Sequence, residues 1–188
     1  MGKVLEKERE NESDKNWNST KKFICLLGIS DAMRYLHFHR IMHRDLKPDN
    51  ILMDENLYPH ISDFGLSRCF NKSLSKSLNI SMTNRLGTPL YMAPEMYENN
   101  MHYNQGVDVY SFGLIAYEIV SKKKPFSLDG KKLNQIELWM KIADHERPQF
   151  TDEITDPMKS LLSRCWNQNP IDRPSFKEIF DELLGSIS

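Results

Sequence analysis

Cysteine, glycine-rich turns and long apolar runs are scarce in this chain of 188 residues. Its three cysteines, at positions 25, 69 and 165, include no C-x-x-C pair, which argues against a disulfide framework and a zinc ribbon. The eight glycines form no G-x-G-x-x-G loop of the kind that cradles phosphates. No stretch approaches the roughly 18 apolar residues of a membrane-spanning helix. The sequence therefore predicts a soluble, intracellular protein, located in the cytoplasm, with reduced thiols.

The charge of the chain is nearly balanced. Lys and Arg number 25 against 26 Asp and Glu, which gives a formal net charge of −1. A surface that binds by bulk positive charge is therefore absent, and we expect neither nucleic acid nor a membrane as a partner. Residues 1–18 alternate acidic and basic side chains, so we expect a solvated, partly helical lead-in. The length suits one domain that buries roughly 70% of its unfolded surface.

Apolar spacing predicts a mainly helical chain with small β-hairpins. From residue 107 to residue 120 the sequence is apolar almost all round, which indicates a helix buried on every side. Trp139, on a later helix, belongs either to the core or to a docking helix for substrates. The expected helices cover 19–38, 107–120, the regions around 136–143 and 158–165, and 174–187. The expected strands cover 41–42, 51–53 and 60–62.

Three motifs follow one another in the middle of the chain. Residues 43–50 read HRDLKPDN, residues 63–65 read DFG, and residues 92–95 read MAPE. In this order they resemble the catalytic loop, the metal-binding loop and the end of the activation segment of eukaryotic protein kinases. The resemblance continues through DVYSFG at 108–113 and NPIDRP at 169–174, and it spans roughly residues 20 to 185. It implies the mainly helical C-terminal lobe of the kinase fold.

The parts of a kinase that belong to its N-terminal lobe are missing from the resemblance. These parts are a glycine-rich loop over the phosphates, a lysine on a strand and a helix glutamate that pairs with this lysine. We therefore expect residues 1–188 to be the C-terminal lobe alone, beginning near the hinge. Within it, residues 1–18 would be the lead-in and residues 63–95 the activation segment.

The resemblance assigns chemistry to five residues. Asp45 matches the aspartate that accepts the proton of the attacking hydroxyl, and Lys47 matches the lysine that reaches the transferring phosphate of ATP. Asn50 and Asp63 match the metal ligands, and their oxygen donors suit Mg²⁺. Leu52 would line the floor beneath the adenine. Because a hairpin should join Asn50 to Asp63, we expect these two side chains to converge on one metal ion.

Other residues of the same motifs receive structural roles. By resemblance, His43 packs beneath Phe64 and takes no part in chemistry. Glu95 and Arg173 would form the buried ion pair of the family. Asp108 would hold the main chain of the catalytic loop from the central helix. These roles are geometric, so the structure tests them directly.

Residues 67–85 of the expected activation segment are rich in hydroxyls and positive charge. They contain five serines, one threonine, four basic residues and no acid, so this stretch carries a charge of +4. A phosphate placed here, with Thr83 as the first candidate, would pair with Arg44 after action by an upstream kinase. A serine-rich loop that is only soluble is the alternative.

The substrate class follows from finer resemblances. Thr88, within GTPLY at 87–91, resembles the substrate-facing threonine of serine/threonine kinases, and Lys47 points the same way. The stretches 108–113 and 165–174 resemble tyrosine kinases instead. Together they imply the tyrosine-kinase-like group of serine/threonine kinases, with protein substrates. Two alternatives stay open. The first is a catalytically incompetent lobe that acts as a scaffold, which the missing glycine-rich loop and strand lysine favour for residues 1–188 taken alone. The second is a small-molecule phosphotransferase, against which the motif at 92–95 and the Thr88 loop argue.

Overall fold

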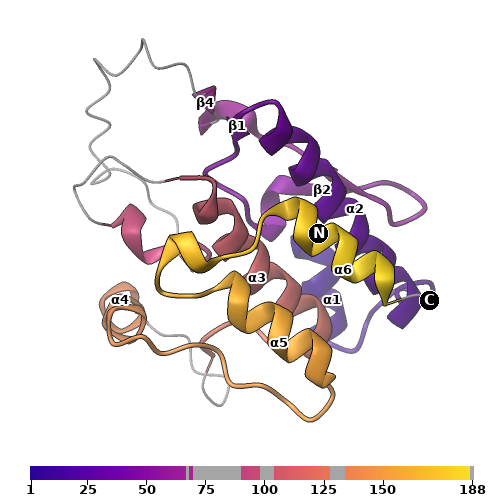
Figure 1. The fold of residues 1–188 in the computed structure, drawn as a ribbon. Coiled ribbons are helices and arrows are strands. Elements are labelled where there is room, and N and C mark those ends of the chain that lie inside the picture. The colour runs from indigo at the N-terminus through magenta and orange to yellow at the C-terminus, as the bar shows by residue number, and fades with distance from the viewer. Residues whose placement is uncertain (67, 70–89, 98–103, 128–133, 187–188) are drawn as a thin grey trace.

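The computed structural model describes residues 1–66, 68–69, 90–97, 104–127 and 134–186, which form a mainly helical body with short strands (Figure 1). The mainly helical class that the sequence predicted is therefore confirmed. Within the described ranges, no helix has the length and apolar character needed to cross a bilayer. The helices are α1 (Gly2–Arg9), α2 (Ser19–Phe38), α3 (Gly106–Ser121), α4 (Gln135–Ala143), α5 (Asp156–Cys165) and α6 (Phe176–Gly185). The strands are β1 (Ile41–Met42), β2 (Ile51–Met53), β3 (Pro59–Ile61) and β4 (Arg68–Cys69), and 3-10 turns occur at η1 (Pro48–Asn50), η2 (Phe64–Leu66), η4 (Pro94–Met96) and η5 (Pro170–Asp172).

Helix α2 spans the residues that the sequence predicted for it. It begins where the side chain of Asn18 accepts a hydrogen bond from the Lys21 amide at 3.0 Å. Its buried face repeats at helical spacing through Cys25, Leu26 and Ile29. Helix α2 packs against α6 and β3, and its C-terminal end leads into β1 and the loop that follows.

Helix α3 is the centre of the lobe, as its uniform apolarity predicted. All but two of its sixteen residues are buried, and α5 packs along it (Figure 1). The two helices meet at Gly113, where an added Cβ atom would lie 2.8 Å from the Cβ of Cys165. Gly113 is therefore required by the close approach of α5 and not by its backbone conformation.

The hairpin β2–β3 lies one residue earlier in its second strand than the sequence predicted. Met53 pairs with Pro59 and Ile51 pairs with Ile61. The Asp54 carboxylate accepts the Tyr58 amide at 2.8 Å, and the Asp54 amide donates to the Tyr58 carbonyl at 3.1 Å. This turn closes the hairpin before His60 and so sets the register. Strand β1 pairs with β4, with Ile41 opposite Cys69.

The interpretation of residues 1–18 as a solvated lead-in was wrong in one respect. The segment is helical over α1, but Met1, Leu5 and Trp17 are buried in the core of the lobe. Charged residues of α1 also form specific contacts, because Glu8 pairs with Lys22 at 2.5 Å and accepts the Trp17 indole N–H at 2.8 Å. The alternating charges that suggested solvation are therefore partly used to fasten α1 to the body.

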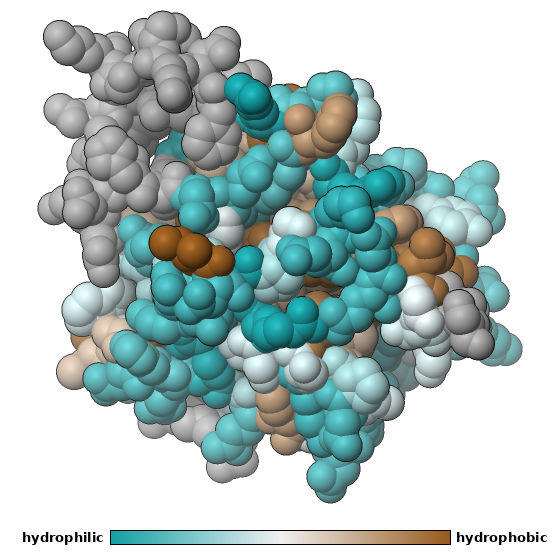
Figure 2. Space-filling view, in the orientation of Figure 1, coloured by the Kyte–Doolittle hydropathy of each residue, from teal (hydrophilic) through white to brown (hydrophobic). Residues whose placement is uncertain are grey.

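Helix α4 turns much of its apolar surface to solvent. Leu138 and Ile142 are buried, whereas Ile136, Trp139 and Met140 are exposed. The core alternative for Trp139 is therefore wrong, because half of its surface is accessible. Figure 2 shows that the face turned to the viewer is otherwise mainly hydrophilic, with hydrophobic residues in small patches.

Candidate active site

Asp45, Lys47 and Asn50 form a contact cluster in the loop between β1 and β2. The Lys47 ammonium donates to the Asp45 carboxylate oxygen Oδ2 at 2.7 Å. The Asn50 amide nitrogen donates to the same oxygen at 2.9 Å and to the Asp45 carbonyl at 2.7 Å. One carboxylate oxygen thus receives two donors, which fixes the orientation of Asp45. The structure thus brings together three residues that the sequence singled out for separate roles.

Asp63 is brought to the same end of the hairpin by main-chain hydrogen bonds. The Ser62 amide and hydroxyl both donate to the Asn50 carbonyl at 2.9 Å, one residue beyond the paired strands. Asp63 follows at once in the left-handed backbone region, with φ of 61°, and its exposed carboxylate accepts the Gly65 amide at 3.4 Å. Convergence of Asn50 and Asp63 on one metal ion remains a prediction, although the backbone places the two residues at adjacent hairpin ends.

Asp108 of α3 holds the beginning of the loop between β1 and β2, as expected. Its buried carboxylate accepts the main-chain amides of His43 at 2.9 Å and of Arg44 at 2.8 Å. It also contacts the Nε2 atom of His37 at 2.9 Å. Arg44 has a φ of 71°, a conformation that costs free energy for a residue with a side chain, so the two amide bonds help to maintain it. The loop therefore depends on the central helix for its shape.

Both ring nitrogens of His43 are used for structure. Nδ1 accepts the Asp45 amide at 3.3 Å, which leaves Nε2 as the donor to the Ser62 carbonyl at 2.9 Å. The imidazole lies 5.5 Å from the Phe64 ring, centre to centre. The packing role predicted for His43 is confirmed. Its ring connects the residue that precedes Asp63 to the backbone of Asp45.

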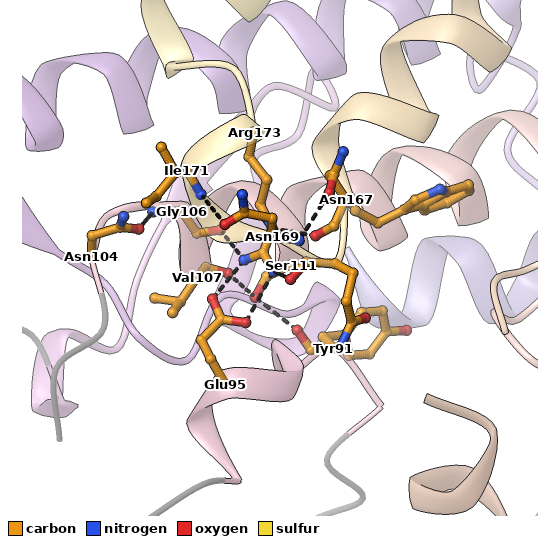
Figure 3. A network of polar contacts seen from close by, with 12 residues as sticks. Tyr91, Glu95, Asn104, Gly106, Val107, Ser111, Asn167, Asn169, Ile171 and Arg173 are labelled. Atoms are coloured by element: carbon orange, nitrogen blue, oxygen red, sulfur yellow. Dashed lines mark hydrogen bonds and ion pairs between the residues drawn. The ribbon is translucent and has the colours of Figure 1, made fainter. Parts of the chain in front are cut away.

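The ion pair expected between Glu95 and Arg173 is present and has two hydrogen bonds. The guanidinium nitrogens donate to the two carboxylate oxygens at 2.6 and 3.0 Å. Arg173 also donates to the carbonyls of Gly106 and Asn167, at 2.9 and 2.8 Å, so it joins η4, α3 and the turn before η5 (Figure 3). Its side chain is completely buried.

A second polar network, which the sequence interpretation missed, lies around Glu118 of α3. Glu118 is 2% exposed, receives the Arg9 guanidinium at 2.6 Å, and accepts the hydroxyl of Tyr91. Ser111 donates to the Tyr91 carbonyl at 2.7 Å (Figure 3). Burial raises the pKa of Glu118 above its ordinary value, while Tyr91 and Arg9 oppose this shift. The signal that could have revealed this network is an acidic residue in the last turn of an otherwise apolar helix.

The other predicted site residues fall into two groups. Leu52 lies on β2 with 57% of its surface exposed, beside the loop that holds Asp45. Thr83 and Thr88 lie outside the described residues. The phosphosite and the substrate-facing threonine therefore remain predictions.

A carboxylate that is held in position lies in the loop that precedes the hairpin, and further oxygen donors lie at the ends of the two strands. Asp45 presents a carboxylate that Lys47 and Asn50 hold in position. The side-chain nitrogen of Asn50 donates to Asp45. Among the described residues, no hydrogen bond uses the side-chain oxygen of Asn50. This oxygen and the Asp63 carboxylate are therefore suited to a hard divalent cation. The donor set thus fits Mg²⁺.

Comparison with known proteins agrees with this chemistry. The protein kinase domain family matches residues 3–184. A probable serine/threonine-protein kinase of Dictyostelium discoideum is 39% identical over 158 residues, and a probable LIM domain-containing serine/threonine-protein kinase is 38% identical over 155. A dual specificity protein kinase of the same organism is 42% identical over 142 residues.

These alignments cover 84%, 82% and 76% of this chain, but only 10%, 22% and 27% of the respective relatives. The chain thus spans at most about a quarter of the length of these proteins. The family match, in contrast, covers nearly all of the chain, and it agrees with the helical fold and with the loop that Asp108 anchors. The chain belongs to the protein kinase domain family.

Proposed function

We propose that this lobe transfers the γ-phosphate of ATP to serine and threonine hydroxyls of proteins. One observation supports the proposal most strongly. Lys47 and Asn50 both donate to one oxygen of Asp45, which lies in a loop anchored to the central helix. A positioned carboxylate with an adjacent cation is what transfer of a phosphoryl group to a hydroxyl requires.

Asp45 acts as the base in this proposal. Its carboxylate orients the acceptor hydroxyl and takes the proton of that hydroxyl, a contribution of roughly 10²- to 10⁴-fold for a general base. Lys47 already lies 2.7 Å from this carboxylate, so its charge is available to the transferring phosphate next to the base. Asn50 keeps Asp45 oriented through two donations. Loss of any of the three changes the geometry of the other two.

Asn50 and Asp63 would hold Mg²⁺, and a bound magnesium ion would neutralise charge on the phosphates of ATP. Leu52, exposed on β2, offers an apolar floor for the adenine. Arg44 would pair with a phosphate on the activation segment, residues 63–95, and Thr83 is the residue we expect to carry it.

The acceptor class rests on Lys47 and Thr88, which resemble those of serine/threonine kinases, and we place the chain in the tyrosine-kinase-like group. One relative is called a dual specificity kinase, so the assay must separate the products. The test is transfer of labelled γ-phosphate from Mg-ATP to a generic basic protein, followed by analysis of the phosphorylated amino acids. Phosphoserine and phosphothreonine are expected. Phosphotyrosine as the main product would overturn the assignment of acceptor class.

A scaffold without catalysis is the second candidate. The exposed side chains of Leu52 and Phe64 favour it, and 48% of the surface of Phe64 is accessible. Exposed apolar side chains that lie close together often mark a surface that binds another protein. Titration of the chain with Mg-ATP separates the two functions. Binding that depends on Asp63 supports the kinase, whereas no binding, together with no phosphotransfer, supports the scaffold.

A further inference from the structure

Three residues from distant parts of the chain meet at one buried carboxylate. Arg9 lies at the end of α1, Glu118 in the last turn of α3, and Tyr91 in the segment that leads to η4. Arg9 and Tyr91 both donate to Glu118, one to each carboxylate oxygen. We propose that Arg9 is a positioning residue, which fixes Tyr91 through Glu118 and so sets the acceptor side of the site. The acceptor side is the part of the site that would bind the protein substrate, so this inference rests on the proposed function.

Glu118 needs a positive partner in order to serve as an acceptor. With 2% of its surface exposed, its charged form is disfavoured by lost hydration, and this burial raises the pKa of its carboxyl. The Arg9 guanidinium, at 2.6 Å, offsets that loss. Without Arg9 the buried carboxylate loses its nearest counter-charge, and the charged form that this loss disfavours is the stronger acceptor for the Tyr91 hydroxyl. The charge of Arg9 therefore acts on Tyr91 although the two side chains share only Glu118.

Arg9 is itself held in place by the rest of α1. Leu5, one turn earlier, is buried in the core. Glu8 pairs with Lys22 of α2 at 2.5 Å and accepts the indole N–H of Trp17 at 2.8 Å. The end of α1 is thus fixed from two sides, and the guanidinium of Arg9 can transmit the position of α1 to α3 and Tyr91.

Tyr91 is fixed at both ends by the central helix. Its carbonyl accepts the Ser111 hydroxyl at 2.7 Å, and its own hydroxyl donates to Glu118. It follows Thr88, the residue expected to face the acceptor, by three positions, and it precedes the anchored Glu95 by four. The position of Tyr91 therefore constrains the end of the segment that would present the acceptor hydroxyl to Asp45.

Hydrogen exchange tests the structural part of this inference without requiring catalysis. Arg9→Met should accelerate exchange of the amides of residues 91–97 by roughly tenfold, because a largely buried ion pair is broken. Arg9→Lys should restore most of the protection. The matched control is Arg164→Met, which breaks the exposed pair with Glu182 and should leave these amides unchanged. Unchanged exchange in Arg9→Met would overturn the inference.

Kinetics test the positioning role in the same variants. Arg9→Met should raise KM for the acceptor protein by roughly tenfold and leave KM for Mg-ATP within about twofold, because only the acceptor side moves. Tyr91→Phe should give the same split, and the double variant should be no worse than either single variant. Tyr117→Phe, which removes the hydrogen bond of a tyrosine in α3 to the Gln149 carbonyl, is the control.

The outcomes separate the two proposals. Equal changes in both KM values, or additive effects in the double variant, would contradict a positioning role for Arg9. If the parent chain transfers no phosphate, the proposed function fails and the exchange experiment still decides whether Arg9 holds Tyr91.

Discussion

Arg173 and Glu95, 78 positions apart in the sequence, face each other through two hydrogen bonds of 2.6 and 3.0 Å. The arginine side chain has no exposed surface, and that of the glutamate is 17% exposed. The pair fastens η4 to the turn before α6 (Figure 3). Its role is therefore structural, since it joins two distant segments of the chain.

Removing the charge of Glu95 should destabilise the lobe strongly. Glu95→Gln leaves Arg173 as a buried cation without a counter-charge, so we expect the free energy of unfolding to fall by about 3–5 kcal/mol. Denaturant unfolding measures this change. The same substitution at Glu182, whose pair with Arg164 is exposed, should cost at most about 1 kcal/mol. Equal losses for the two variants would show that burial of the pair contributes nothing.

Asp108→Asn should loosen the catalytic loop. Both oxygens of the Asp108 carboxylate are used, because they accept the main-chain amides of His43 and Arg44 and contact His37. The side chain of an asparagine at this position has only one acceptor oxygen. We expect a loss of about 2–3 kcal/mol in stability and faster hydrogen exchange at the amides of residues 43 and 44. Asp172→Asn, at an exposed residue, is the control and should cost no more than about 0.5 kcal/mol. Protected amides in Asp108→Asn would contradict the anchoring role.

Gly113→Ala should destabilise the packing of α3 against α5. An alanine Cβ would lie 2.8 Å from that of Cys165, so the helices must separate at a cost of about 1–3 kcal/mol, which exceeds the gain in helix propensity. Gly185→Ala is the matched control, since nothing lies within 4 Å of its added Cβ. Thermal unfolding should show a lower Tm for the first variant and an equal or higher Tm for the second. A Tm that does not fall in Gly113→Ala would show that the helices adjust without strain.

Glu178 should contribute stability that depends on pH. It accepts the Ser175 amide at the start of α6, and this bond, followed by that to the Ser175 hydroxyl, lowers the pKa of its carboxyl below the ordinary 4.5. The contribution is therefore present above pH 4.5 and is lost as the pH falls through the lowered value. Thermal unfolding of the parent and of Glu178→Gln should differ at neutral pH and converge in acid. A difference in Tm between the two proteins that grows as the pH falls would contradict the lowered pKa of Glu178.

Local patterns predicted most elements, because they are fixed by neighbours in the sequence. Helix α2 was predicted with its observed ends because its apolar residues repeat at helical spacing, and the structure adds the Asn18 cap at its start. The second strand of the hairpin was predicted one residue late. Its register depends on the Asp54 turn, whose side-chain hydrogen bond to the Tyr58 amide is not visible in the apolar pattern.

Of the candidate site, Asp45, Lys47 and Asn50 were singled out because all three lie in one motif, whereas the hydrogen bonds that join them were not foreseen. The pair of Arg9 and Glu118 was missed, since 109 positions separate its members and each belongs to a pattern with an ordinary explanation. A charged segment usually indicates solvation. Only the packing of α1 on the core shows that one of its charges serves the buried acid of α3.

The most direct test of the account is the rate of phosphate transfer from Mg-ATP to a generic basic protein by the parent chain and by Asp45→Asn. The parent should transfer phosphate, and Asp45→Asn should reduce the rate by roughly 10²-fold or more without a comparable loss of stability. Asp152→Asn, the same change at an exposed residue, should leave the rate unaltered. Transfer that persists in Asp45→Asn, or a parent chain that transfers nothing, would contradict the catalytic role proposed for this lobe.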